Sequence, residues 1–334
     1  MTTLLEARYR AVLRLLPAYY RHEREEEMVE TYLWDVDQET QEQSRPTLGE
    51  VASIVALAVR SRLGAGGAPR RYAVVGSAVR LFALFAVLLQ AASAVADRVL
   101  GLTWASTRGG SQWDMFTDGF AGHGVWVGAG ALAQWFLPLL WTVAYVALLR
   151  DHRRLAQVSA LVAALPTLWP LVDIWARDFA PSDSAYVVAA AVPAWASALA
   201  LCTAHHRDAP AAALPAGTPG LVFAASCVLM GGSAVALPGG VGTVWALVTC
   251  YLVTALARLL YRVRGERRVP AEEAAALAAL GLLLLAVRIT AVYPWLDVLP
   301  GALRVGVLTQ AVVLVTLTAA LAVVSGRDLL SRGT

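Results

Sequence analysis

The sequence predicts an all-α protein, an integral membrane bundle of about eight transmembrane helices preceded by a small cytosolic three-helix domain. The chain has 334 residues, of which 58% are hydrophobic and 15% charged, and its mean hydropathy of +0.59 lies outside the usual range of soluble domains. Uncharged apolar runs recur that are long enough to cross about 30 Å of hydrocarbon. The alternating ten-residue pattern of membrane β-barrels is absent, so helices must satisfy the backbone.

The first helical segment is predicted before Pro17, where five apolar side chains share one helical face. Glu6 precedes Arg10 by one turn, which places the two side chains to pair. The members of the apolar face are Leu5, Tyr9, Val12, Leu13 and Leu16.

Two further helices are predicted within residues 1–63. Residues 18–38 have an acidic run on one side and an apolar stripe on the other, and Thr47 with Glu50 has the spacing of a capping box that begins a helix ending near Leu63. About 60 residues leave a small core, so we expect support from the membrane part or from a partner. The stripe consists of Tyr20, Met28, Val29, Tyr32, Leu33 and Val36.

The Gly-rich residues 64–72 predict a flexible linker, followed by a transmembrane domain over 73–325 and a cytosolic tail over 326–334. The expected spans are 73–96, 124–149, 155–176, 185–204, 219–238, 241–261, 273–293 and 303–325. Prolines within them predict kinks, at Pro138, Pro166, Pro170 and Pro193.

The arginines predict the orientation of these spans. All 27 basic residues are Arg, and outside the first 63 residues thirteen fall in segments on one side of the membrane and four on the other, Arg98, Arg108, Arg177 and Arg304. Because cytoplasmic loops collect basic residues, we expect both termini in the cytoplasm, with the chain in the plasma membrane. If residues 219–238 formed a re-entrant segment, the loops after them would lie on the side of the membrane opposite to the one predicted.

Five polar residues are predicted inside the membrane. Asp173 and Arg288 lie one to two turns from the outer boundary, where they either pair between helices or reach the headgroups separately. Gln90, Gln134 and Gln310 lie deeper, and such amides join helices more often than they bind a substrate.

The first outer loop, near residues 101–124, is rich in aromatic residues. It predicts a segment lying along the headgroups, with a metal site at Asp114, Asp118 and His123 as the weaker alternative. No metal site or cofactor is therefore expected. The three cysteines do not have metal-binding spacing, and the sequence contains no nucleophile-elbow, P-loop or HExxH motif, so we expect no enzyme.

The segment RYRAVLRLLPAYYRHEREEEM, residues 8–28, resembles the short helical prefix of various bacterial membrane proteins, some of them permease-prefix proteins and others with the HAAS-type signalling domain. The likeness is carried by Tyr9, Leu13, Leu16, Pro17, Tyr20 and residues 25–28, and covers about 63 residues. It implies a cytosolic interaction module, linked in some relatives to PadR-type transcriptional regulators and fused in others to transporter permeases. The large extracytoplasmic domain of such permeases has no counterpart here.

We therefore expect a signalling or scaffold protein that contacts the lipid bilayer and docks a cytosolic protein, either a transcriptional regulator or an ATPase subunit. The alternative is a transport component, a permease-like subunit or a small-substrate carrier. The arginines beside the spans are explained by orientation, so no direct binding of nucleic acid is expected. The expected partner-binding residues are Arg21, Arg24, Glu25, Glu26, Glu27 and Glu30.

Overall fold

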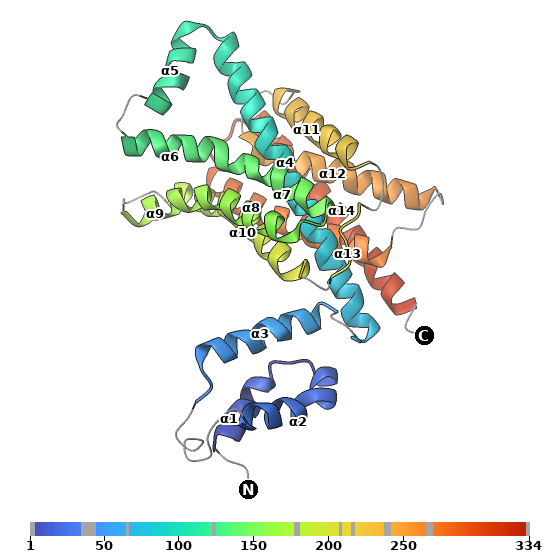
Figure 1. Ribbon diagram of the computed structural model, residues 1–334. Coiled ribbons are helices and arrows are strands. Elements are labelled where there is room, and N and C mark those ends of the chain that lie inside the picture. The colour runs from blue at the N-terminus through green and yellow to red at the C-terminus, as the bar shows by residue number, and fades with distance from the viewer. Residues whose placement is uncertain are drawn as a thin grey trace. The chain divides into compact units, whose positions relative to one another are not determined.

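The structure is a computed structural model, and it confirms the predicted all-α membrane bundle (Figure 1). It describes residues 4–34, 45–64, 67–121, 125–176, 181–206, 209–214, 218–236, 242–264 and 270–331. Two compact units are present, one formed by Met1–Val79 with Thr203–Ala209 and the other by Arg80–Cys202 with Pro210–Thr334. Each is described by itself below.

The first unit contains the helices α1 (Leu4–Leu13), α2 (Ala18–Trp34) and α3 (Leu48–Arg62), with the first turns of α4. The predicted apolar face of α1 is confirmed, because Leu5 and Leu13 are fully buried. The capping box is also confirmed: Glu50 N–H donates to Thr47 Oγ1 at 3.3 Å, and Thr47 N–H donates to Glu50 Oε2 at 2.7 Å. The core consists of Tyr9, Leu13, Leu16, Val29, Ile54 and Ala58.

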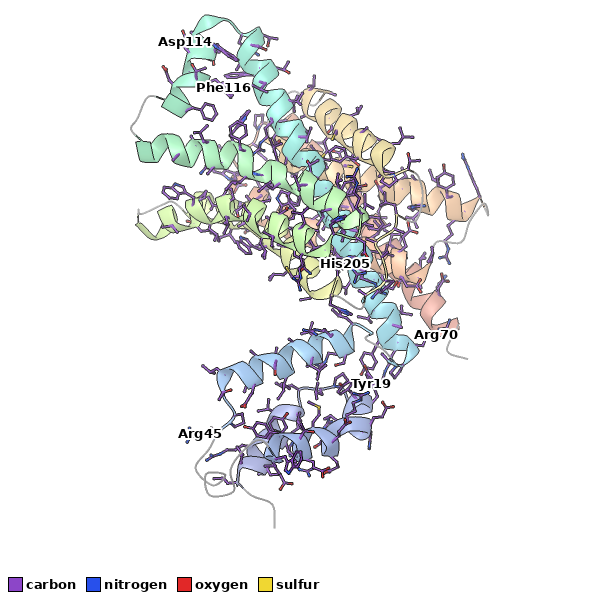
Figure 2. The ribbon with its side chains drawn as sticks, in the orientation of Figure 1. Tyr19, Arg45, Arg70, Asp114, Phe116 and His205 are labelled. Carbon is purple, nitrogen blue, oxygen red and sulfur yellow. The ribbon has the colours of Figure 1, made fainter. Side chains whose placement is uncertain are left out.

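The start of α4 packs closely on the end of α3 within this unit. Gly64 has a φ of 81°, a left-handed conformation that favours glycine. A Cβ at Gly76 would overlap the carbonyl group of Leu63, so the two helices meet at backbone distance. Tyr19 of α2 donates to the Ser61 carbonyl at 2.7 Å, and its ring lies 5.1 Å from that of Tyr72 (Figure 2).

Eight helical stretches of the described chain are long and apolar enough to cross a membrane, as the sequence predicts. Their bounds are Arg70–Thr107, Gly128–Leu149, Arg153–Val172, Val187–Ala204, Pro219–Ala236, Ala246–Val263, Ala271–Trp295 and Leu303–Asp328. The fifth is helical over 18 residues, which is consistent with a complete crossing, whereas the turn at 238–240 lies outside the described residues.

The second unit contains the larger part of α4 (Arg70–Thr107) and all later helices. Their bounds are α5 Gly110–Ala121, α6 Val125–Phe136, α7 Leu140–Leu149, α8 Arg153–Ala164, α9 Leu168–Ala176, α10 Pro181–Ala204, α11 Pro219–Ala236, α12 Gly242–Val263, α13 Ala271–Val292 and α14 Gly301–Ser331. Two apolar cores meet on α4: one face packs with α7, α8 and α10, and another with α11 to α14.

The region expected as an aromatic outer loop is largely helical. With 38 residues α4 is about 57 Å long, well beyond the hydrocarbon thickness, and α5 follows it after a short turn at Gly109. Phe116 and Phe120 of α5 contact the ring of Trp135 edge-on, with centroids 5.1 and 5.9 Å away. This aromatic packing explains why the segment folds as a helix. Asp114 and Phe116 both project from α5 (Figure 2).

Pro138 interrupts the second span, where the short 3₁₀ turn Leu137–Leu139 separates α6 from α7. A proline has no N–H, so the carbonyl of Gln134, four residues earlier, loses its helical donor. Arg98 of α4 replaces it: Nη2 donates to the Gln134 carbonyl at 2.8 Å and Nε to the Trp135 carbonyl at 2.9 Å. Thus Arg98, counted above only as an outer arginine, bridges α4 to the break in α6. A second 3₁₀ turn, Leu165–Thr167, contains Pro166.

A buried polar contact joins α12, α13 and α14. The Tyr251 hydroxyl donates to the Leu277 carbonyl at 3.0 Å and lies 3.2 Å from Thr318 Oγ1. A Cβ at Gly281 would collide with both hydroxyl groups, so a glycine is required for the two side chains to meet there. Tyr251 is 1% exposed, and the contact fixes the register of three helices.

We predict that Gly281→Val destabilises the full protein by about 1–3 kcal/mol, because the new side chain forces Tyr251 and Thr318 away from the Leu277 carbonyl. Thermal unfolding of the purified protein in detergent measures this. Gly306→Val on α14 is the control, since nothing lies within 4 Å of a Cβ there. Equal destabilisation by both substitutions would contradict the account.

We further predict that Arg98→Leu destabilises the wild-type background by about 1–3 kcal/mol but has a much smaller effect when Pro138→Ala is also present. An alanine at that position supplies an N–H to the Gln134 carbonyl, so the carbonyl no longer depends on Arg98. A double-mutant cycle of thermal stability measures the coupling. Additive effects of the two substitutions would show that the guanidinium does not compensate for the proline.

Candidate functional site

A groove of about 610 Å³ lies on the first unit, mainly along α2. Tyr9 of α1 and Glu50 of α3 complete its wall, so the folding of three helices is needed to form it. We call it the α2 groove. Its lining residues are Tyr9, Tyr20, Arg24, Glu27, Met28, Thr31, Tyr32, Trp34 and Glu50.

The inner wall of the α2 groove is held by the core. The rings of Tyr9 and Tyr32 stack with centroids 3.9 Å apart and an interplanar angle of 6°. The Tyr32 hydroxyl donates to Glu50 Oε2 at 3.3 Å. Burial, followed by the nearby Glu50 carboxylate, raises the pKa of both phenols above 10.0, so they remain protonated at neutral pH.

The outer part of the α2 groove is open and chemically suited to a protein partner. The Trp34 side chain is 95% exposed, and Met28 lies half-buried one and a half turns before it on α2. The Arg24 guanidinium lies 5.9 Å from the Tyr20 ring centroid. Tyr, Trp, Met and Arg are the residue types enriched at the centres of protein interfaces.

The structure separates the predicted partner-binding residues. Arg24 and Glu27 line the α2 groove, whereas Arg21, Glu25 and Glu26 line a second hollow of about 280 Å³ with Ala18, His22 and Glu23. Glu30 is exposed on α2 and lines neither.

Arg10 of α1 forms ion pairs with Glu6 and with part of the acidic run of α2. The predicted pair with Glu6 is confirmed at 3.1 Å, and the two terminal nitrogens of Arg10 contact the two oxygens of Glu26 at 2.9 Å each. Glu25 lies 3.8 Å from the same guanidinium. These hydrogen bonds hold the pKa of Glu26 below 4.5 and raise that of Arg10. Part of the acidic run therefore joins α1 to α2, although the Glu26 side chain remains 81% exposed.

The aromatic part of the groove was not predicted as a site. Tyr20, Met28 and Tyr32 were predicted only as part of the apolar stripe of α2, and they do contact the small core while also lining the groove. The stripe is wider than three short helices can cover. An excess of large apolar side chains over the core available to bury them was the signal that could have revealed the groove.

The predicted intramembrane residues occupy different environments. Gln310 donates to Thr249 Oγ1 at 3.2 Å and joins α14 to α12, whereas Gln90 is half-buried on α4 and the Gln134 side chain is exposed on α6. Arg288 is 2% exposed on α13. The side chain of Asp173 lies outside the described residues, so its predicted pair with Arg288 stays a prediction.

The described part of the chain contains no group of three His, Cys, Asp or Glu side chains placed to hold a metal ion. Asp114 and Asp118 lie on α5, and His123 is outside the described residues.

We predict that Glu26→Gln increases hydrogen exchange in α1 and α2 of the full protein at neutral pH. Because the folded-state pKa of Glu26 is depressed, its stabilising effect is complete above the unfolded-state value near 4.5 and is lost as the pH falls through the lower folded-state value. After correction for intrinsic exchange, wild type should therefore approach the variant in acid. Glu30→Gln, an exposed change of equal charge, should match wild type. A difference that is independent of pH would contradict the role of Glu26.

In comparisons with known proteins, no family model, no curated protein and no solved structure matches the chain.

Proposed function

We propose that this chain is a signalling or scaffold component of the bacterial plasma membrane, with both termini in the cytoplasm, whose N-terminal helical unit docks a cytosolic regulator or complex subunit. The observation that supports this most directly is the α2 groove. It combines stacked tyrosines that the core holds in place with a Trp34 side chain that is 95% exposed. The resemblance of residues 8–28 to prefix interaction domains agrees with it.

The partner segment that fits the groove is an amphipathic helix. Its apolar face would pack on Tyr20, Met28 and Trp34, and a basic side chain would reach Glu27 or Glu50 along the same wall. Fixed aromatic side chains lose little conformational entropy when a partner binds. The groove is therefore suited to recognition by a few large contacts.

The transport alternative has weaker support. A carrier for a polar solute needs polar side chains that converge within the membrane, whereas Gln310 is engaged with Thr249 between two helices and the Gln134 side chain faces outward. An association with a separate ATPase would use the same α2 groove, so the experiment below would detect it as well.

We predict that a photo-cross-linking amino acid at position 31 of the full protein, on the α2 groove, captures a cytosolic partner in cells, whereas the same amino acid at position 23 on the second hollow does not. The captured protein should bind the purified full chain, and Tyr20→Ala or Trp34→Ala should weaken binding by roughly thirtyfold, as expected for a hot-spot aromatic residue.

The matched control for that affinity is His22→Ala, which changes an exposed residue of the same helix outside the α2 groove. Equal capture from positions 31 and 23, or equal affinity of the Trp34 and His22 variants, would exclude the groove as the docking surface. Reporter fusions at the two termini test the orientation separately: a reporter on the outer face of the membrane would overturn it.

A further inference from the structure

The second unit contains a cavity of about 340 Å³ among α4, α11, α12 and α13, within the volume range of small-molecule sites. Its walls are largely apolar, formed by side chains such as Phe85, Leu88, Leu89, Val222, Leu277 and Leu280. Val253 and Thr254 of α12 also line it and are exposed, so the cavity opens on the lateral face of α12. In a membrane that face meets lipid chains. The cavity belongs to the second unit, and the α2 groove to the first, so it plays no part in the docking proposed above.

Three hydroxyl groups in the cavity wall are already engaged as donors, whereas that of Tyr261 belongs to a half-exposed side chain at one end of the cavity. Ser226 donates to the Val222 carbonyl at 2.8 Å, Thr254 to the Cys250 carbonyl at 2.9 Å, and Tyr251 to the Leu277 carbonyl at 3.0 Å. A polar solute in the cavity would lose its water and find few donors in return, which is costly. An alkyl chain suits these walls.

A single cation lies among the described residues that line the cavity, the guanidinium of Arg258. It is at the end of α12, one turn before Tyr261, a half-exposed residue that also lines the cavity. From Cys250 to Tyr261 the cavity wall follows α12 for about 17 Å. This matches the thickness of one leaflet of hydrocarbon, about 15 Å, with the charge where lipid headgroups begin.

The guanidinium of Arg258 keeps donors for a second anion. Its Nε lies 2.8 Å from Glu273 Oε1, which leaves the terminal nitrogens of the fork for another acceptor. Arg262, one turn further along α12, instead uses both terminal nitrogens on Asp328, at 3.2 and 3.3 Å, and does not line the cavity. The two arginines thus differ in their access to a ligand.

We infer that this cavity binds a single-chain anionic amphiphile of the fatty-acid type, with its alkyl chain between α4, α11 and α12 and its carboxylate on Arg258. The alkyl chain enters through the lateral opening beside Val253. Glu273 competes for the same guanidinium, so the buried ion pair limits the affinity for the anionic head.

The test uses the full protein in neutral-lipid nanodiscs with two photoreactive probes of equal chain length, a diazirine fatty acid and the corresponding fatty alcohol. We expect the acid to label peptides of α4, α11 and α12 at lower concentration than the alcohol. Arg258→Gln should weaken labelling by the acid roughly tenfold, while Arg262→Gln leaves it unchanged. Ala257→Phe, which fills the cavity, should reduce labelling by both probes.

Glu273→Gln is expected to change labelling by the acid in the opposite direction to Arg258→Gln. Removing the competing carboxylate should strengthen labelling by the acid several-fold, whereas a purely structural pair would give weaker or unchanged labelling. The Glu273→Gln variant therefore still tests the proposal if Arg258→Gln fails to fold. Equal labelling by acid and alcohol, equal loss in the Arg258 and Arg262 variants, or weaker or unchanged labelling in Glu273→Gln would each overturn the proposal.

Discussion

Inside a bilayer, a backbone carbonyl that loses its helical partner must find a donor within the protein, because no water is available to replace it. This requirement explains the contact at the break before Pro138, where Arg98 donates to the carbonyls of Gln134 and Trp135. At Leu277, a carbonyl within the unbroken helix α13, Tyr251 instead adds a further hydrogen bond where the missing side chain of Gly281 makes room. In both places a side chain of one helix bonds the backbone of another, so these contacts also fix which helices are neighbours.

The helix α4 is central to the bundle. Its buried faces are rich in alanine, and they pack on both apolar cores of the second unit. Small side chains allow helices to approach closely in lipid, where the hydrophobic effect does not drive their association. The residues Ala83, Ala86, Ala91, Ala92, Ala94 and Ala96 are each at most 5% exposed. Beyond the alanines, Arg98 adds a polar contact, so α4 combines close packing with a specific hydrogen bond.

Features that depend on neighbouring residues in the chain could be predicted from the sequence, and those that depend on distant residues could not. Span length and hydropathy are local, and so are the pairing of Glu6 with Arg10 and the capping box at Thr47; all four predictions are confirmed. The α2 groove needs side chains from three helices, and its aromatic wall has the same pattern as a core stripe. Residues 110–121 lack a long apolar run, yet they form α5 because their rings pack on Trp135 of another helix.

The arginines are expected to orient the chain in the membrane, and some of them also form ion pairs within the protein. Orientation is predicted from the number of arginines in each loop, and nearby carboxylates have little effect on it. Several of the predicted inner arginines nevertheless have a carboxylate partner: Arg153 lies 2.7 Å from Asp151, Arg258 pairs with Glu273, and Arg262 with Asp328. The last two pairs join α12 to α13 and to α14, so Arg258 and Arg262 connect helices as well as contributing to the predicted orientation. Because Asp328 uses both terminal nitrogens of Arg262 whereas Glu273 contacts Arg258 through Nε, it is Arg258, at the mouth of the apolar cavity, that retains binding capacity.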